Sequence, residues 1–136
     1  MSDFSNYYRD VIGDHLLKGG AFSPAANYYI AIFTAATGLA DNNPSAEIAE
    51  AGYARVEITL DAFVDGVSTN SAAITFAAAE ELWTEATHFA IVDHLSNVTW
   101  GSDVNVLMWD ALTVAKTVTS GNALQFNAGE IDVTIQ

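Results

Sequence analysis

The chain has 136 residues and no cysteine, and its 17 acidic residues against four lysines and arginines give a net charge of −13. This length fits one domain with its own apolar core, and the lack of cysteine excludes a disulfide framework, thiolate zinc sites and a cysteine nucleophile. Four scattered cations are too few for a nucleic-acid-binding footprint, and an anionic membrane would repel the chain. The acidity fits either solubility at high density or docking on a basic partner surface. The cations are Arg9, Lys18, Arg55 and Lys116.

The first residues predict a helix over about 3–18, because apolar side chains recur there at three- and four-residue steps. Asp3 is the candidate N-cap, and Gly19-Gly20 supplies a left-handed stop. Gly13 and Leu17, which lies one turn later on the same polar face, break the pattern, and they fit either fraying of the helix or a close contact with another subunit. We expect the helix to bury four side chains against a sheet, namely Phe4, Val11, Ile12 and Leu16.

After the helix the hydrophobic period changes to two, which predicts strands. Asn27–Phe33 is apolar on both faces, as in a strand covered on both sides, whereas Arg55–Leu60 alternates as a half-exposed strand does. The polar segment Thr37–Gly52 between them is too long for a turn and predicts a surface loop suited to binding. Asp65-Gly66 marks a hairpin-like reversal. The further strand candidates are Ser71–Phe76, Thr87–Asp93, Val104–Trp109, Ala111–Val118, Ala123–Phe126 and Ile131–Ile135.

Short strands without long helices between them predict a mainly β fold, an antiparallel β-sandwich of about seven or eight short strands with one N-terminal α-helix. Ala77–Trp83 fits a helical turn but is too short to decide. No repeat, low-complexity tract or linker is visible, so we expect residues 1–136 to form a single domain, with the sandwich over about 27–136. Neither a signal peptide nor a membrane-spanning stretch of roughly 18–20 apolar residues is visible, and we expect synthesis in the cytoplasm.

The three histidines do not predict a metal site. His88 and His94 would lie roughly 20 Å apart on an extended chain, too far to share an ion. His15 falls on the apolar face of the predicted helix, where a hydrogen-bonded core histidine is the common outcome.

No other pattern indicates chemistry. The nucleophile elbow G-x-S-x-G and both phosphate-binding glycine loops are missing. Asp61 and Asp65 are spaced wrongly for a calcium loop, and the pair Glu80-Glu81 is more typical of a solvated loop than of an acid–base site. We therefore predict no enzyme, no catalytic residues, no metal ligands and no cofactor. Of the large aromatic residues, Trp109 is expected in the core, and Trp100, in the polar stretch Asn97–Asp103, is a candidate interface residue.

Several segments, in order, resemble a family of short bacteriophage virion proteins over nearly the whole chain. The most specific are GYAR (Gly52–Arg55), WTEATHFAIVD (Trp83–Asp93) and the A-L-T-x-x-K-T-V-x-S-G-x-x-x-x-F-x-A-G stretch (Ala111–Gly129). Similar proteins are labelled tail-fibre or minor tail proteins, and small β-rich proteins of this size also serve as capsid decoration, or cement, proteins. The chain departs from the family in the loop Thr37–Gly52 and in His94–Val104, so the partner-binding surface is expected to differ.

The resemblance implies a non-enzymatic structural protein of the virion. A capsid decoration protein on the outer shell is the favoured hypothesis, since packaged DNA would repel an acidic chain from the inner wall. A tail or tail-fibre component is the alternative, and a carbohydrate- or receptor-binding module is an alternative of another class. The expected partners are further copies, with a homotrimer favoured, and the major capsid protein or other virion proteins, but neither nucleic acid nor a membrane.

Overall fold

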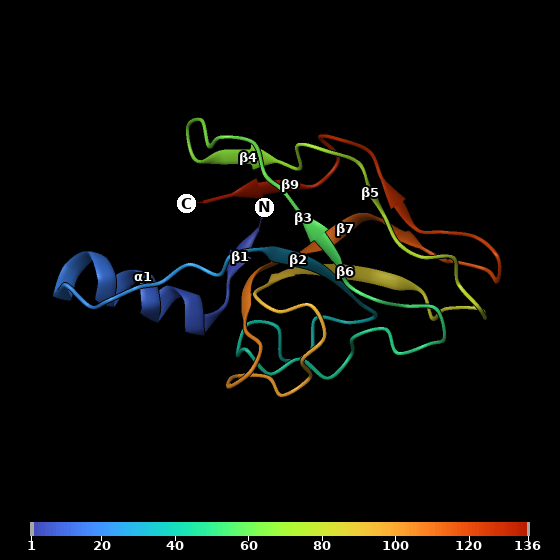
Figure 1. The fold of residues 1–136 in the computed structure, drawn as a ribbon, viewed down its shortest axis with the longest axis horizontal. Coiled ribbons are helices and arrows are strands. Elements are labelled where there is room, and N and C mark those ends of the chain that lie inside the picture. Colours follow the sequence, from blue (N-terminus) through green and yellow to red (C-terminus); the bar gives the residue numbers. More distant parts are fainter. Residues whose placement is uncertain (1, 136) are drawn as a thin grey trace.

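The computed structural model describes residues 2–135, which form nine strands and one helix. The strands make up a β body, and the helix projects from one end of it (Figure 1). In chain order the elements are β1 (Asp3–Phe4), α1 (Asn6–Lys18), β2 (Tyr28–Phe33), β3 (Val56–Ile58), β4 (Val67–Thr69), β5 (Ile74–Thr75), β6 (Ala86–Val92), β7 (Val106–Lys116), β8 (Gln125–Phe126) and β9 (Asp132–Thr134).

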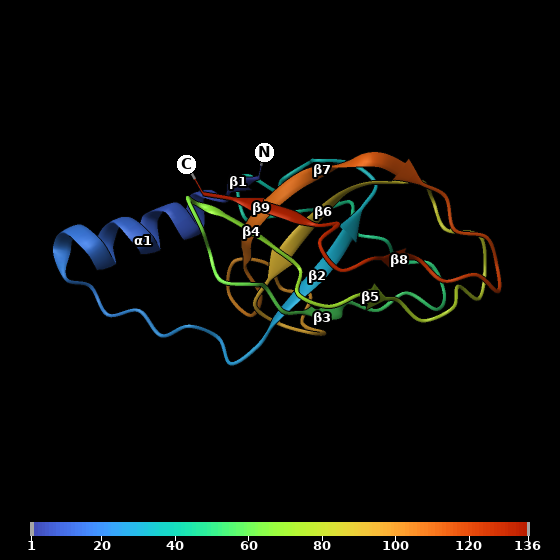
Figure 2. The same cartoon turned by 90° about the horizontal axis from the view of Figure 1, so that it is seen from above.

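The β body has a five-stranded antiparallel sheet in the order β1-β7-β6-β2-β3 and two short ribbons, β4-β9 and β5-β8. One face of the large sheet packs against the ribbons (Figure 2), and its side chains, such as Ile32 and Phe89, share a core with Phe76, Phe126 and Trp83. The predicted mainly β, antiparallel fold with one N-terminal helix is confirmed, and its two layers approximate the predicted sandwich.

The opposite face of the large sheet, which we call its outer face, is covered by loops. Ala31 and Phe33 of β2 point to this side, where Leu39 and Val104 from two different loops close over them. The prediction that this strand is covered on both sides is therefore confirmed. The polar excursion Thr37–Gly52 is only partly a surface loop, because four of its residues are buried: Leu39, Asn42, Pro44 and Ile48.

Two details of the strand prediction change, one predicted turn is confirmed, and the strand β4 (Val67–Thr69) was not predicted. Val104–Trp109 and Ala111–Val118 form the single strand β7. Ala77–Trp83 is not helical, since Ala79 N–H donates to the carbonyl of Asn122 and Trp83 N–H donates to that of Val118, so that this segment bonds across to the chain after β7. The reversal at Asp65-Gly66 is confirmed: both residues have positive φ, 51° and 80°, as a two-residue hairpin turn requires.

The helix begins later than predicted. Asp3 and Phe4 pair with β7 as the edge strand β1, and Ser5 is the N-cap, with its hydroxyl accepting from Tyr8 N–H at 3.2 Å. The predicted stop is confirmed, since Gly19 takes a left-handed conformation with φ of 70°. No helix within residues 2–135 is both long and apolar enough to cross a membrane.

The predicted burial of the helix against the sheet is wrong. No residue of α1 is fully buried, and Val11 and Ile12 are only half-buried. The side chain of Leu16 is 70% exposed and that of Leu17 is 87% exposed. The helix leaves the body after β1 (Figures 1 and 2), and the segment 20–27 returns along one of its sides.

Two aromatic side chains hold this returning segment to the helix. The ring of Phe22 lies 6.2 Å from Tyr8 and 6.0 Å from His15, measured between centroids. Phe4, also expected against the sheet from the helix, is half-buried in β1 and stacks edge-on against Tyr8. The apolar periodicity of the helix therefore indicates correctly that one face packs against other residues. These residues belong largely to neighbouring segments of the chain and not to the sheet.

Candidate functional site

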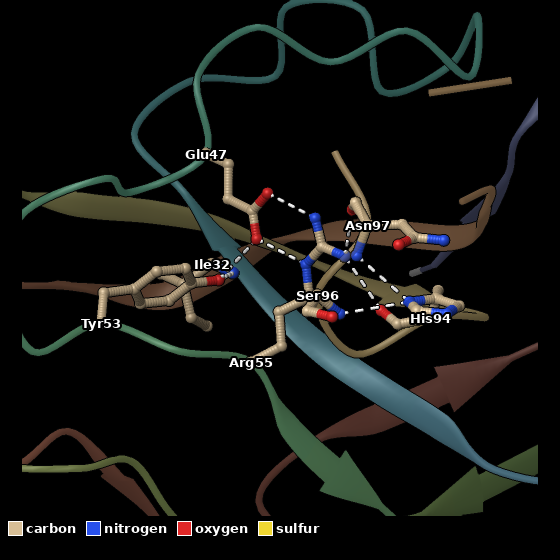
Figure 3. Close-up of polar contacts among 7 residues, drawn as sticks. All are labelled: Ile32, Glu47, Tyr53, Arg55, His94, Ser96 and Asn97. Carbon is tan, nitrogen blue, oxygen red and sulfur yellow. Dashed lines mark hydrogen bonds and ion pairs between the residues drawn. The ribbon is translucent and has the colours of Figure 1, made fainter. Parts of the chain in front are cut away.

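Arg55 is the one charged residue that is buried in the described part of the chain. Its guanidinium binds the Glu47 carboxylate through two hydrogen bonds of 2.7 Å, and its Nη1 donates to the carbonyls of His94 and Asn97 at 2.9 Å (Figure 3). Arg55 precedes β3, Glu47 lies in the loop after β2, and the two carbonyls belong to the loop after β6. One side chain thus fastens both loops that cover the outer face of the sheet.

The partners of Arg55 are themselves fully engaged. The Tyr53 hydroxyl donates to Glu47 at 2.9 Å and accepts from Ile32 N–H at 3.0 Å (Figure 3). Burial, and then the neighbouring Glu47 carboxylate, raises the pKa of Tyr53 well above 10, so that it stays a neutral donor. This network is a structural clamp, because each of its polar groups serves another part of the same chain.

The histidines are used locally. His94 Nδ1 accepts from the backbone N–H groups of Ser96 and Asn97 at 3.2 and 3.1 Å, which shapes the loop after β6. His88 contacts the Thr87 hydroxyl at 2.8 Å, on a sheet strand. His15 is exposed, so the predicted core histidine is wrong; its ring donates to the carbonyl of Gly20. Within residues 2–135, no three histidine or acidic side chains gather as a metal site.

The acidic residues singled out in the sequence do not come together. Glu80 and Glu81 lie on an exposed loop, where Glu81 accepts from Ala51 N–H at 2.8 Å. A neighbouring carboxylate, Glu50, has its pKa lowered to about 2, chiefly by hydrogen bonds from the side chain and backbone of Thr84. Both contacts tie the segment before β3 to the segment before β6, which is a structural role.

The two tryptophans named by the sequence both pack on the outer face of the sheet. Trp100 is half-buried: its ring lies 6.2 Å from Phe33 and 4.9 Å from the Arg55 guanidinium, so it serves the clamp. Trp109 is also half-buried beside the same apolar cluster, not fully in the core as expected. Trp100 as an interface residue stays a prediction.

A groove that the sequence did not indicate opens between the root of α1 and the β body. Its volume is about 380 Å³, and we call it the root groove. Asp61 is the one charged residue among the residues lining it. Phe63 and Ile135 at its rim are 44% and 43% exposed, although both are large apolar residues. The lining comes from Tyr8, Tyr28, Ile58, Leu60, Asp61, Phe63, Ile91, Leu107, Met108 and Ile135.

The apolar surface continues beyond the groove onto the β4 hairpin. Val64 and Val67 flank the Asp65-Gly66 turn and are 69% and 42% exposed. Ile135 N–H donates to Gly66 at 2.7 Å, which holds the rim of the groove to this hairpin. Contiguous exposed apolar surface of this kind marks contact sites for other molecules.

The comparison with known proteins agrees with the resemblance found in the sequence. Residues 3–134 match the model of a family described as "Podophage GP4 fiber I protein gp80". The match spans nearly the whole chain and confirms the resemblance to short bacteriophage virion proteins of the tail-fibre kind. No curated protein matches the chain significantly.

Proposed function

The chain belongs to the podophage GP4 fiber I family, and from this membership we propose that it is a non-enzymatic structural subunit of a phage tail fibre. The family match over residues 3–134 carries the proposal. The internal use of these polar groups supports it, because Arg55, Glu47 and Tyr53 form hydrogen bonds with one another and with other parts of the same chain.

A fibre subunit works by holding a rigid shape and offering surfaces to its neighbours. The clamp at Arg55 supplies rigidity, since it joins two long loops to the large sheet. The projecting α1 and the root groove supply surfaces, since both leave large apolar side chains in contact with water. The function proposed is therefore assembly.

Capsid decoration is the second candidate, and the net charge of −13 favours it over any place inside the shell. A strongly acidic chain fits the outer surface of a shell whose interior is filled with DNA. The same charge is compatible with a tail fibre, which also lies outside the particle, so charge alone does not favour the capsid over the tail.

The two candidates are separated by where the protein sits in the particle and how many copies it has. Purified virions are labelled with gold-conjugated antibody against the chain, with antibody against the major capsid protein as the matched control, and the copy number is measured by quantitative mass spectrometry. We expect label at the tail and a copy number that is a small multiple of the tail symmetry. Label over the shell at a copy number near that of the capsid protein would replace the fibre proposal with decoration.

A further inference from the structure

We propose that the α1 helix of one copy docks its exposed leucines into the root groove of a second copy, so that copies of this chain join through their helical arms. The inference names the partner of the surfaces described above, and it rests on the proposed function only for the place of the assembly in the virion. It starts from two observations. The helix α1 (Asn6–Lys18), which we call the arm, has leucines exposed to solvent, and the root groove has exposed apolar walls.

The arm presents its apolar side chains far from its own body. Leu16 and Leu17 are 70% and 87% exposed at the C-terminal end of α1. Tyr8, on the same helix, lines the root groove. Leu16 and Leu17 lie eight and nine residues further on, about 12–13 Å along the helix axis at roughly 1.5 Å per residue. Because the helix is continuous from Asn6 to Lys18, these leucines cannot turn back into the groove of their own chain.

The groove has the size and chemistry to receive leucine side chains. Its 380 Å³ is more than twice the roughly 150 Å³ of an apolar cavity that holds a benzene-sized group. Its rim residues Phe63 and Ile135 are exposed and apolar, and the walls are formed largely by aliphatic and aromatic side chains. Burying Leu16 and Leu17 here would remove apolar surface from water on both partners.

The distribution of charge fits another copy as the occupant. Within α1 the cations Arg9 and Lys18 cancel the anions Asp10 and Asp14, so the helix is neutral, counting His15 as neutral, and the rest of the chain carries the whole net charge of −13. A basic partner would be drawn to the acidic body and away from a neutral arm. The arm of another copy brings no net charge into the groove, so the contact itself adds no charge repulsion, and the two acidic bodies stay at opposite ends of the arm.

The length of the arm fits this role. A helix of 13 residues is about 20 Å long, whereas charges are screened over about 8 Å at physiological ionic strength. Contact through the tip of the arm therefore keeps two acidic bodies apart by more than the screening length. In addition, Lys18 follows Leu17 at the tip, where it forms an exposed ion pair with Asp14 at 3.2 Å, and its charge is opposite to that of Asp61 in the groove.

The arm and the groove are different surfaces, so each copy offers one of each. Reciprocal exchange of arms closes as a dimer. Exchange in one direction gives a ring when the rotation between copies closes, of which the trimer expected from the sequence is an example, and an open chain of copies when it does not. In each arrangement every contact is the same pair of surfaces, which makes the proposal testable by complementation.

The first test measures self-association of the full chain by sedimentation over a range of concentrations, at 0.15 M and 1 M salt. The arm variant is L16S/L17S, the groove variant is F63S, and the matched control is L82S, which replaces a leucine that is 61% exposed in the segment between β5 and β6. We expect the wild type and the control to associate alike and more tightly at 1 M salt, since salt screens the repulsion between the bodies. Each buried leucine contributes roughly 10- to 100-fold to the dissociation constant, so the arm variant should lose at least 100-fold.

The second test mixes the arm variant with the groove variant. Each supplies the surface that the other lacks, so the mixture should form one-to-one dimers although neither variant associates alone. Because the chain has no cysteine, L17C in one partner and F63C in the other should also form a single disulfide cross-link under oxidation. Unchanged circular dichroism and thermal melting of the variants show that they are folded.

Several results would overturn the inference. A wild type that is monomeric at every concentration and salt would do so, as would association that survives F63S while L16S/L17S abolishes it, since that result means that arms pack on arms. The outcome is separate from the labelling of virions. Label at the tail with a monomeric chain refutes the arm contact alone, whereas arm-dependent association of a chain missing from virions refutes the proposed fibre function alone.

Discussion

Replacing Arg55 by methionine should unfold the protein at much lower denaturant concentration. The side chains of Arg55 and Glu47 are 4% and 18% exposed, so the substitution leaves a carboxylate largely buried without its partner. Breaking a buried pair in this way costs about 3–5 kcal/mol, and the partial exposure of Glu47 places the expected loss near the lower end, at about 3 kcal/mol. This is a large part of the roughly 5–15 kcal/mol by which domains of this size are stable.

The measurement is urea unfolding followed by tryptophan fluorescence, with the free energy of unfolding extrapolated to water. Lys116→Met is the matched control, because its ion pair with Glu130 is 3.4 Å long and its partners are 34% and 36% exposed. Such exposed pairs contribute less than about 1 kcal/mol. The double variant Arg55→Met with Glu47→Gln should lose less than the sum of its single changes. If Arg55→Met and Lys116→Met lost equally little, the clamp would not stabilise the fold.

Three further substitutions test local features. Gly13→Ala should slow amide exchange in α1 about five-fold, because alanine favours a helix by about 1 kcal/mol and a Cβ at Gly13 meets nothing within 4 Å. Gly52→Ala should lower the free energy of unfolding by more than about 1 kcal/mol, since φ there is +88° and a Cβ would lie 2.6 Å from the Ala78 carbonyl. The pKa of Glu50 is lowered from 4.5 to about 2, so its ionised carboxylate stabilises the fold above pH 4.5, and this stabilisation is lost as the pH falls towards 2. In an acid titration of the free energy of unfolding, Glu50→Gln should therefore show a weaker dependence on pH between 4.5 and 2 than the wild type.

Most of the strands were predictable because their signal is local, whereas β1 lay within the predicted helix and β4 was not predicted. Tyr28–Phe33 is apolar at every position, and a run of that kind is stable only when both faces are covered, whichever segments supply the cover. The turn at Asp65-Gly66 was predictable for the same reason, since its positive φ angles follow from residue type. The residues that cover the outer face of β2 were not predictable, because Leu39 and Val104 come from loops without periodicity.

The clamp and the root groove escaped prediction because they depend on long-range placement. Alternation put Arg55 on the same face as Glu57 and predicted exposure for both, yet Arg55 lies just before β3 and turns inward to Glu47. The groove joins Tyr8 to Phe63 and Ile135, which are far apart in the chain. One signal was present in the sequence: Leu17 lies off the apolar face of the helix, and among residues 2–135 it is the most exposed of the large apolar residues.

The two hypotheses for assembly make opposite predictions about salt. A decoration protein held by its acidic surface on a basic shell loses attraction as salt screens the charges, so its binding weakens. The arm contact is apolar, while the charge it must overcome is the repulsion between two bodies of −13 each, so its binding strengthens. Releasing the protein from purified virions over a series of salt concentrations therefore tells which force holds it there. Retention of the wild type at 1 M salt, together with loss of L16S/L17S at every salt concentration, would mean that the neutral helix and not the acidic body makes the contact.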